Sequence, residues 1–154
     1  MNLFVGNLLL STNYSRNAIR NMGNCNVCII DDDIVYQFTA KKFLEKISEV
    51  SKIMIFSNGL EASQHLHDKP TTAEDLPDII FLDIRMPVMD GFTFLERFKT
   101  IKPNIAKPIT IYMVSSSPES KDREKALAYS EVSEYLIKPL TFDIFKEKIY
   151  SFLN

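Results

Sequence analysis

The sequence has few of the residues on which several common functional sites depend. It contains four scattered glycines and no tryptophan among 154 residues. Walker and Rossmann nucleotide sites need a glycine-rich loop around the phosphates, so both kinds of site are excluded. No apolar run approaches the roughly 20 residues of a membrane span, and the N-terminal run lacks the flanks of a signal peptide. We therefore expect a cytoplasmic protein with no membrane partner.

Cysteine and histidine are equally scarce. Cys25 and Cys28 have C-x-x-C spacing, but they lead into an apolar run and not into a helix start, where a thiol is activated. We interpret them as small core residues. His65 and His67 are the only histidines, and on a predicted helix they would point to different faces. This shortage disfavours a metal site at the histidines and a Ser-His-Asp or Cys-His hydrolase.

The charged residues are close to balanced. Lysine and arginine total 18 and aspartate and glutamate total 20, for a net charge of −2 and a pI of about 5.7. Non-specific nucleic-acid binding needs a basic surface, so we expect no direct nucleic-acid partner. Hydrophobic residues make up 45% of the chain and charged residues 25%, proportions typical of one folded domain.

Two regions are distinguished by their patterns. Residues 1–25 are polar and asparagine-rich over much of their length. We interpret them as an N-terminal extension of unknown role, and a start at Met22 stays open as an alternative. Residues 26–154 show the alternating pattern of a single domain.

Within that domain, apolar runs alternate with amphipathic stretches. Runs rich in β-branched residues predict strands covered on both faces, at residues 27–30, 53–56, 79–82, 109–114 and 135–137. Helical spacing predicts helices at residues 34–47, 60–66 and 92–98. A fourth helix would begin after an N-cap at Ser117, with Pro118 as its first residue, and would run to about residue 129. A fifth would follow the cap Thr141. In the first helix the apolar positions are Val35, Phe38, Phe43, Leu44 and Ile47. The alternation predicts an α/β fold, a doubly wound parallel sheet of five strands.

Polar residues follow four of the five predicted strands: Asp31, Asp32 and Asp33, then Asp83, then Ser115, then Lys138. Ligands of open α/β sheets bind outside the carboxyl ends of the strands, so we expect these side chains to share one crevice. Converging carboxylates repel one another unless a hard cation lies among them, and Mg²⁺ prefers oxygen ligands. Asp83 could then attack phosphorus and form an acyl phosphate, while Lys138 and Ser115 stabilise the phosphoryl oxygens. The alternative is that the aspartate triplet caps the next helix and Lys138 is solvated.

Four segments together resemble the receiver domain of two-component response regulators. They are IIDDD at 29–33, FLDIRMPVMDG at 81–91, MVS at 113–115 and YLIKP at 135–139. The match covers about residues 26–154 and is similar to the stand-alone, chemotaxis-type receivers. It implies a flavodoxin-like (βα)5 fold with strand order 2-1-3-4-5.

The resemblance also implies a role for each matching residue. Asp83 would be the phosphoacceptor, and Mg²⁺ or Mn²⁺ would be bound by Asp31, Asp32, Asp83 and the backbone carbonyl of Arg85. Ser115 and Lys138 would contact the phosphoryl group, Tyr135 would be the aromatic switch, and Pro139 would follow a cis peptide bond. Arg85 departs from the commonest pattern, and we hypothesise that it changes the lifetime of the acyl phosphate.

The implied function is that of a signalling phosphoacceptor and not of an enzyme, apart from its own phosphorylation and dephosphorylation. A sensor histidine kinase or a histidine phosphotransfer protein would donate the phosphoryl group. Because no sequence follows the last predicted helix, we expect a separate output protein. A haloacid-dehalogenase-type phosphatase would need an aspartate where Arg85 stands, and an FMN carrier would need a phosphate loop where three aspartates stand. A receiver-like scaffold that is never phosphorylated remains as the alternative.

Overall fold

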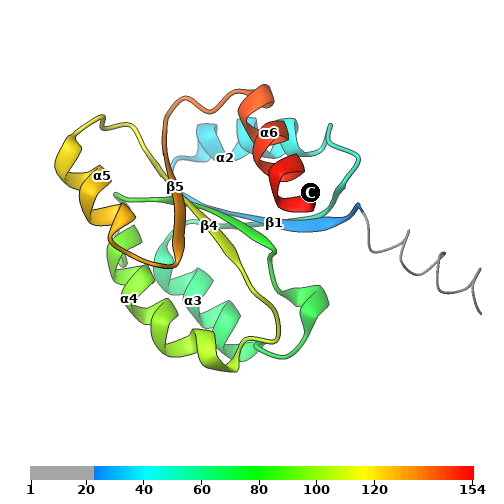
Figure 1. Cartoon of the computed structure of the whole chain (residues 1–154), viewed down its shortest axis with the longest axis horizontal. Coiled ribbons are helices and arrows are strands. Elements are labelled where there is room, and N and C mark those ends of the chain that lie inside the picture. The colour runs from blue at the N-terminus through cyan, green and yellow to red at the C-terminus, as the bar shows by residue number, and fades with distance from the viewer. Residues whose placement is uncertain (1–22) are drawn as a thin grey trace, which may run out of the picture.

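The computed structural model describes residues 23–154, whose strands form one five-stranded parallel sheet (Figure 1). The spatial order is β2 (Val50–Phe56), β1 (Cys25–Ile30), β3 (Ile79–Asp83), β4 (Thr110–Ser115) and β5 (Val132–Ile137). This confirms the doubly wound fold and the strand order 2-1-3-4-5. Residues 1–22 of the expected extension lie outside the described residues, and Cys25 begins β1.

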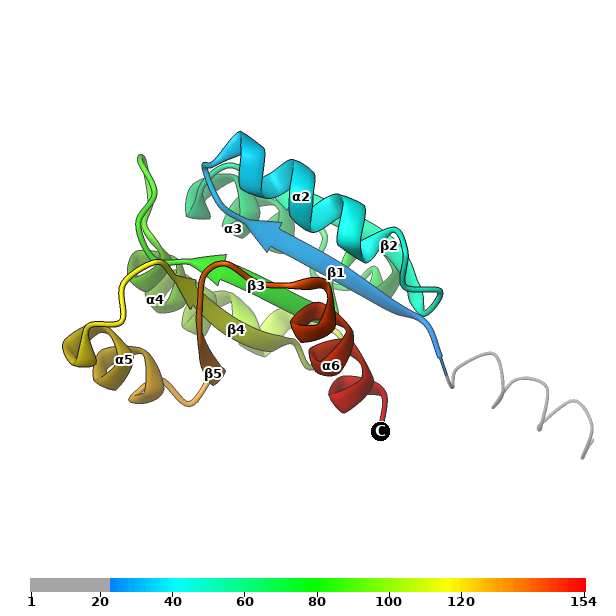
Figure 2. The ribbon, with the colours of Figure 1, turned by 90° about the horizontal axis from the view of Figure 1, so that it is seen from above.

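Helices cover both faces of the sheet. Figures 1 and 2 show α2 (Ile34–Leu44) and α6 (Phe142–Leu153) on one face. The other face carries α3 (Gly59–Asp68), α4 (Gly91–Ile101) and α5 (Ser120–Leu127). Short 3-10 turns lie at Ala73–Asp75 and Lys102–Asn104. In the described part of the chain, no helix is long and apolar enough to cross a bilayer.

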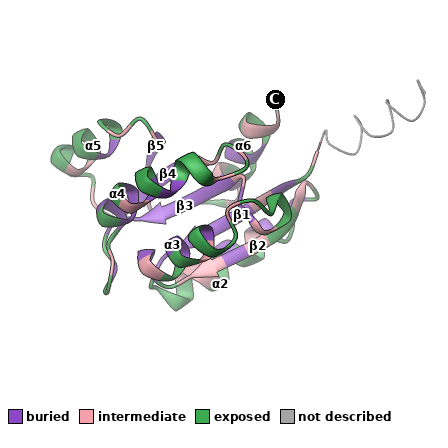
Figure 3. Cartoon of the chain, turned by 90° about the horizontal axis from the view of Figure 1, so that it is seen from below, coloured by how far each residue is buried: buried purple, intermediate pink, exposed green. Residues whose placement is uncertain are grey.

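The core consists of two apolar layers separated by the sheet. Every residue of β3 is buried (Figure 3), as expected for a central strand with helices on both sides. Cys25 packs in the layer under α2 and α6, whereas Cys28 packs in the layer under α3, α4 and α5. Both thiols are free and buried, which confirms that they are core residues. Their side chains lie on opposite faces of the sheet and cannot bind one ligand together.

The apolar face predicted for the first helix is wrong at two positions. Val35 and Phe38 are 75% and 62% exposed, while Ala40 and Leu44 are fully buried. Each helical residue advances the side chain by about 100°, so the side that carries Ala40 and Leu44 points almost opposite to Phe38. The helix also ends at Leu44, three residues before the predicted end at Ile47.

The predicted start of the fourth helix is also wrong. Helix α5 begins at Ser120, after a cap residue, Glu119, that makes no side-chain capping bond. Ser117 lies in a turn, where its Oγ accepts a hydrogen bond from the Glu119 N–H at 3.2 Å. Its backbone carbonyl accepts a hydrogen bond from the Tyr135 hydroxyl at 2.8 Å. These contacts hold Ser117 against β5, and the helix begins two residues later than predicted.

Candidate functional site

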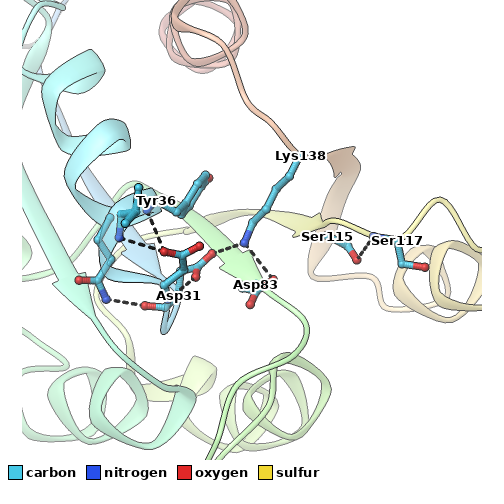
Figure 4. Close-up of polar contacts among 9 residues, drawn as sticks. Asp31, Tyr36, Asp83, Ser115, Ser117 and Lys138 are labelled. Atoms are coloured by element: carbon cyan, nitrogen blue, oxygen red, sulfur yellow. Dashed lines mark hydrogen bonds and ion pairs between the residues drawn. The ribbon is translucent and has the colours of Figure 1, made fainter.

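The carboxyl ends of the central strands bring together the acidic residues that follow β1 and β3. Asp31 follows β1 and is 1% exposed, and Asp83 ends β3 and is 8% exposed. Lys138, from the segment after β5, contacts both (Figure 4). Its Nζ lies 2.5 Å from Asp31 Oδ2 and 3.4 Å from Asp83 Oδ1. Three chain segments that are distant in the sequence therefore meet in one buried ionic cluster.

Asp32 completes a group of three carboxylates. One carboxylate oxygen from each of Asp31, Asp32 and Asp83 lies within 4.8 Å of the other two. Among residues 23–154, these three carboxylates form the cluster that could hold a metal ion. Two oxygens on opposite sides of Mg²⁺ are about 4.2 Å apart, since each lies about 2.1 Å from the ion. The separation and the all-oxygen chemistry therefore fit a hard divalent cation after a small side-chain movement.

Asp33 has a different position from the other two aspartates of the triplet. Its Oδ1 accepts hydrogen bonds from the Val35 and Tyr36 N–H groups at 2.9 and 3.2 Å, which caps α2. Its own N–H donates to Asp31 Oδ1 at 2.9 Å. The capping alternative therefore holds for Asp33, while Asp31 and Asp32 belong to the carboxylate cluster.

Burial and charge shift the proton equilibria of the cluster. Burial, followed by the negative charge of Asp31, raises the pKa of Asp83 from 3.8 to about 6, against the opposing effect of Lys138. Burial lowers the pKa of Lys138, but its hydrogen bond and ion pair with Asp31 outweigh this and raise the pKa overall. The raised pKa of Asp83 therefore reflects its burial first and its crowding by another carboxylate second. A cation in the cluster would relieve that repulsion.

The hydroxyl and the aromatic residue predicted for the site lie on β4 and β5. Ser115 is 3% exposed, and its Oγ accepts a hydrogen bond from the Ser117 N–H at 3.0 Å. Its carbonyl accepts from the Lys138 N–H at 2.8 Å. Tyr135 is 7% exposed and donates its hydroxyl proton to the Ser117 carbonyl. The β4–α5 turn is thus bonded both to β5 and to the backbone of the lysine at the site. The peptide bond before Pro139 is cis.

The loop after Asp83 depends on a glycine at its far end. A Cβ on Gly91 would lie 2.4 Å from the backbone oxygen of Asp83 and 3.0 Å from the Ile84 Cα. The Gly91 N–H also donates to the Ile84 carbonyl at 2.8 Å. Asp90, which precedes the glycine, caps α4 by accepting a hydrogen bond from the Thr93 N–H at 2.7 Å. The Asp-Gly pair therefore starts the helix and lets it approach the backbone of Asp83.

A cavity of about 560 Å³ opens beside the carboxylates, between the β3–α4 loop and α5. Asp32 and Arg85 line one side, and Asp122 and Lys125 of α5 line the other. The Arg85 guanidinium is largely exposed and lies 3.7 Å from Asp122 Oδ2. The side chain of Arg85 is therefore directed toward α5. A role for its backbone carbonyl as a metal ligand stays a prediction.

Sequence reasoning missed one residue that lies against the cluster. The ring of Tyr36, near the start of α2, has the Lys138 Nζ over it at 4.4 Å from the centroid (Figure 4). Burial, then the charges of Asp31 and Asp83, raises the pKa of its hydroxyl. Tyr36 follows the capping residue Asp33 by three positions, which places it in the first turn of the helix beside the aspartates. This spacing was the signal that could have identified it.

Comparison with known proteins agrees with this geometry. The family model for the response regulator receiver domain matches residues 27–150. The chain is similar to a probable C4-dicarboxylate response regulator, DctR of Priestia megaterium, with 31% identity over 80% of this chain and 49% of that protein. The chain thus spans about half the length of this relative.

Two solved structures show the same architecture. A two-component response regulator from Cytophaga hutchinsonii has a TM-score of 0.74 and 27% identity, covering 84% of this chain and 97% of that one. The receiver domain of the sensor histidine kinase PA1611 from Pseudomonas aeruginosa has a TM-score of 0.69, and its structure holds a magnesium ion in the active-site cleft. At 18% identity, with 85% of this chain and 98% of that chain covered, this second likeness shows the fold alone.

The fold, the acidic cluster and the lysine after β5 define a receiver domain. The chain belongs to the response regulator receiver domain family of two-component signalling, in which phosphorylation on an aspartate is characteristic.

Proposed function

We propose that the protein is a phospho-accepting response regulator in which Asp83 takes a phosphoryl group from a phosphohistidine. The observation that carries the proposal is the meeting of Asp31, Asp32 and Asp83 within 4.8 Å, with the Lys138 Nζ 3.4 Å from Asp83. Phosphoryl transfer needs little more than positioning and charge neutralisation. The Lys138 ammonium supplies positive charge beside Asp83, and a cation held by the three carboxylates would supply more.

In the proposed reaction, a carboxylate oxygen of Asp83 attacks the phosphorus of the phosphohistidine. A P–O bond forms, the P–N bond breaks, and the histidine leaves with the electron pair of that bond. Lys138 supplies a positive charge beside Asp83, and the same ammonium pairs with Asp31. The Ser115 hydroxyl, buried at the end of the neighbouring strand, would donate to a phosphoryl oxygen.

The proposal includes a divalent cation bound by Asp31, Asp32, Asp83 and the backbone carbonyl of Arg85. The carboxylate geometry and the oxygen donor set support Mg²⁺, or Mn²⁺, which accepts similar ligands. When bound, this ion would neutralise charge on the phosphoryl oxygens. The magnesium ion in the distantly similar receiver of PA1611 is consistent with that assignment.

We further propose that phosphorylation changes a surface formed by α5, β5 and α6. Tyr135 connects β5 to the β4–α5 turn through its hydrogen bond to Ser117, so movement of Ser115 toward a phosphoryl group would disturb that turn. On this surface a groove of about 330 Å³ is lined in part by Leu127, Tyr135 and Lys148. A separate output protein that prefers the changed surface would read the signal. A sensor histidine kinase or a histidine phosphotransfer protein would supply the phosphoryl group in the cytoplasm.

The test is intact-protein mass spectrometry after incubation with acetyl phosphate and Mg²⁺. We expect one phosphate adduct on the wild-type protein and none on Asp83→Asn or after addition of EDTA. Asp33→Asn is the matched control, because asparagine also caps helices and Asp33 lies outside the carboxylate cluster. This control should still gain the adduct.

The absence of an adduct on folded wild-type protein would contradict the proposal. It would favour the second candidate, a receiver-like scaffold that is not phosphorylated. An adduct that persists on Asp83→Asn would instead contradict the assignment of Asp83 as the phosphoacceptor.

A further inference from the structure

Tyr36 lies on the side of the Lys138 ammonium that the two carboxylates leave open. The Nζ atom has Asp31 at 2.5 Å and Asp83 at 3.4 Å, and the centroid of the Tyr36 ring lies at 4.4 Å. The lysine side chain is only 18% exposed. The ammonium is therefore enclosed by two negative charges and one aromatic face, as Figure 4 shows.

The backbone of Tyr36 is fixed by the start of the helix. Its N–H donates to Asp33 Oδ1 at 3.2 Å, and the Asp33 N–H donates to Asp31 Oδ1 at 2.9 Å. One short chain of hydrogen bonds thus connects the backbone of Tyr36 to the carboxylate that pairs with Lys138. The cap therefore sets the point from which the Tyr36 side chain leaves the helix, next to the Lys138 ammonium.

The hydroxyl of Tyr36 does not explain why the residue is placed there. It is buried, and it has no hydrogen-bond partner within residues 23–154. Burial and the nearby carboxylates also raise its pKa, so the phenol stays neutral. A buried polar atom without a partner costs stability, whereas a neutral aromatic face attracts a cation, most strongly where water is excluded. The cation–π contact of the ring with Lys138 is therefore the interaction that stabilises Tyr36 in this position.

We propose that Tyr36 is a positioning residue for phosphoryl transfer, whose ring holds the Lys138 ammonium against Asp31 and Asp83. This inference rests on the proposed function of Asp83. In the absence of the ring, Lys138 could turn toward solvent, because its side chain is long and its head group prefers water. The charge beside Asp83 would then be in place for a smaller fraction of the time.

The experiment compares Tyr36→Phe, Tyr36→Leu and Phe43→Leu with the wild-type protein. Phe43 is the matched control, because it lies on the same helix but packs against Phe142 and Phe145, with ring centroids 6.2 Å away in each case. The rate of adduct formation is measured against acetyl phosphate concentration, and Mg²⁺ affinity is measured by calorimetry.

Tyr36→Leu should lower the maximal rate roughly three- to tenfold, the range expected for a partly desolvated cation–π contact. Mg²⁺ affinity should not fall, because Lys138 would compete less for Asp31 and Asp83. Tyr36→Phe should retain the wild-type rate, because it keeps the ring and removes only the unpaired hydroxyl. Phe43→Leu should lose stability without losing rate. The proposal is overturned by a wild-type rate in Tyr36→Leu, by an equal loss in Tyr36→Phe, or by an equal loss in Phe43→Leu.

A second measurement separates this inference from the proposed function. Reductive methylation followed by mass spectrometry reports the accessibility of Lys138 without any phosphorylation. Lys138 should be methylated several times faster in Tyr36→Leu than in Tyr36→Phe or the wild type. If the wild-type protein takes no phosphate, the proposed function fails on its own test. Unchanged methylation in Tyr36→Leu would overturn the role of the ring in either case.

Discussion

Replacing Asp83 with asparagine should stabilise the metal-free protein even though it abolishes the proposed activity. Asp83 is 8% exposed, and burial together with the charge of Asp31 raises its pKa from 3.8 to about 6. A carboxylate with a raised pKa favours the protonated form in the folded state. Above pH 6 the folded protein must therefore carry an unfavourable charge that asparagine lacks.

The sign and size of the effect follow from proton linkage. Because the folded state binds the Asp83 proton more tightly than the unfolded state, the contribution of Asp83 to stability is fully present below about pH 4 and is lost as pH rises through about 6. A shift of about two units corresponds to about 3 kcal/mol at 1.4 kcal/mol per unit. The cleft is open to water on one side, so we expect a gain of about 1–2 kcal/mol for Asp83→Asn at pH 8.

Urea denaturation in EDTA at pH 4.5, 6 and 8 measures this gain. The difference between Asp83→Asn and the wild type should be smallest at pH 4.5 and largest at pH 8. A variant that is no more stable than the wild type at pH 8, or a gain that does not change with pH, would refute the reasoning.

Magnesium should offset much of the stability gain of Asp83→Asn. An ion that binds only the folded wild-type protein stabilises it by about 1.4 kcal/mol when its concentration is ten times the dissociation constant. Asp83→Asn loses one of the three carboxylates, so Mg²⁺ should stabilise it less. Equal stabilisation of both proteins by Mg²⁺ would show that Asp83 is not a ligand.

Three further predictions concern other residues. Gly91→Ala should destabilise the protein by roughly 1–3 kcal/mol in urea, because its Cβ would meet backbone at 2.4 Å; wild-type stability would contradict the close approach. Burial raises the pKa of Cys28, and burial followed by nearby carboxylates raises that of Cys25 to about 11, so neither thiol should react with a disulfide reagent at pH 8 until urea unfolds the chain. Rapid labelling of native protein would refute this. Arg85→Asn should change the decay rate of the phosphorylated protein, because Arg85 lines the cavity beside the carboxylates; an unaltered decay would remove the hypothesis.

The sequence was sufficient where local pattern and burial coincide. The five apolar runs predicted strands because a strand covered on both faces needs apolar side chains on both sides. Strand β5 nevertheless begins at Val132, before the predicted start at residue 135. The prediction missed this part because Ser133 and Glu134 are polar and exposed, so no apolar run marks it. Exposure of Val35 and Phe38 could not be read from spacing, because helical periodicity gives a face but does not say which neighbour covers it.

The features of the site also fall into those that local sequence predicts and those that depend on the fold. The amino-acid sequence was enough to identify the carboxylates that end the strands and the lysine that follows the last one. Parallel strands place their carboxyl ends at one edge, so these side chains were expected together. The folded chain was needed to show that Asp33 caps α2 while Asp31 pairs with Lys138. It alone placed the Tyr36 ring over the same ammonium. Contacts between residues about a hundred positions apart depend on how helices pack on the sheet, and no local pattern encodes that packing.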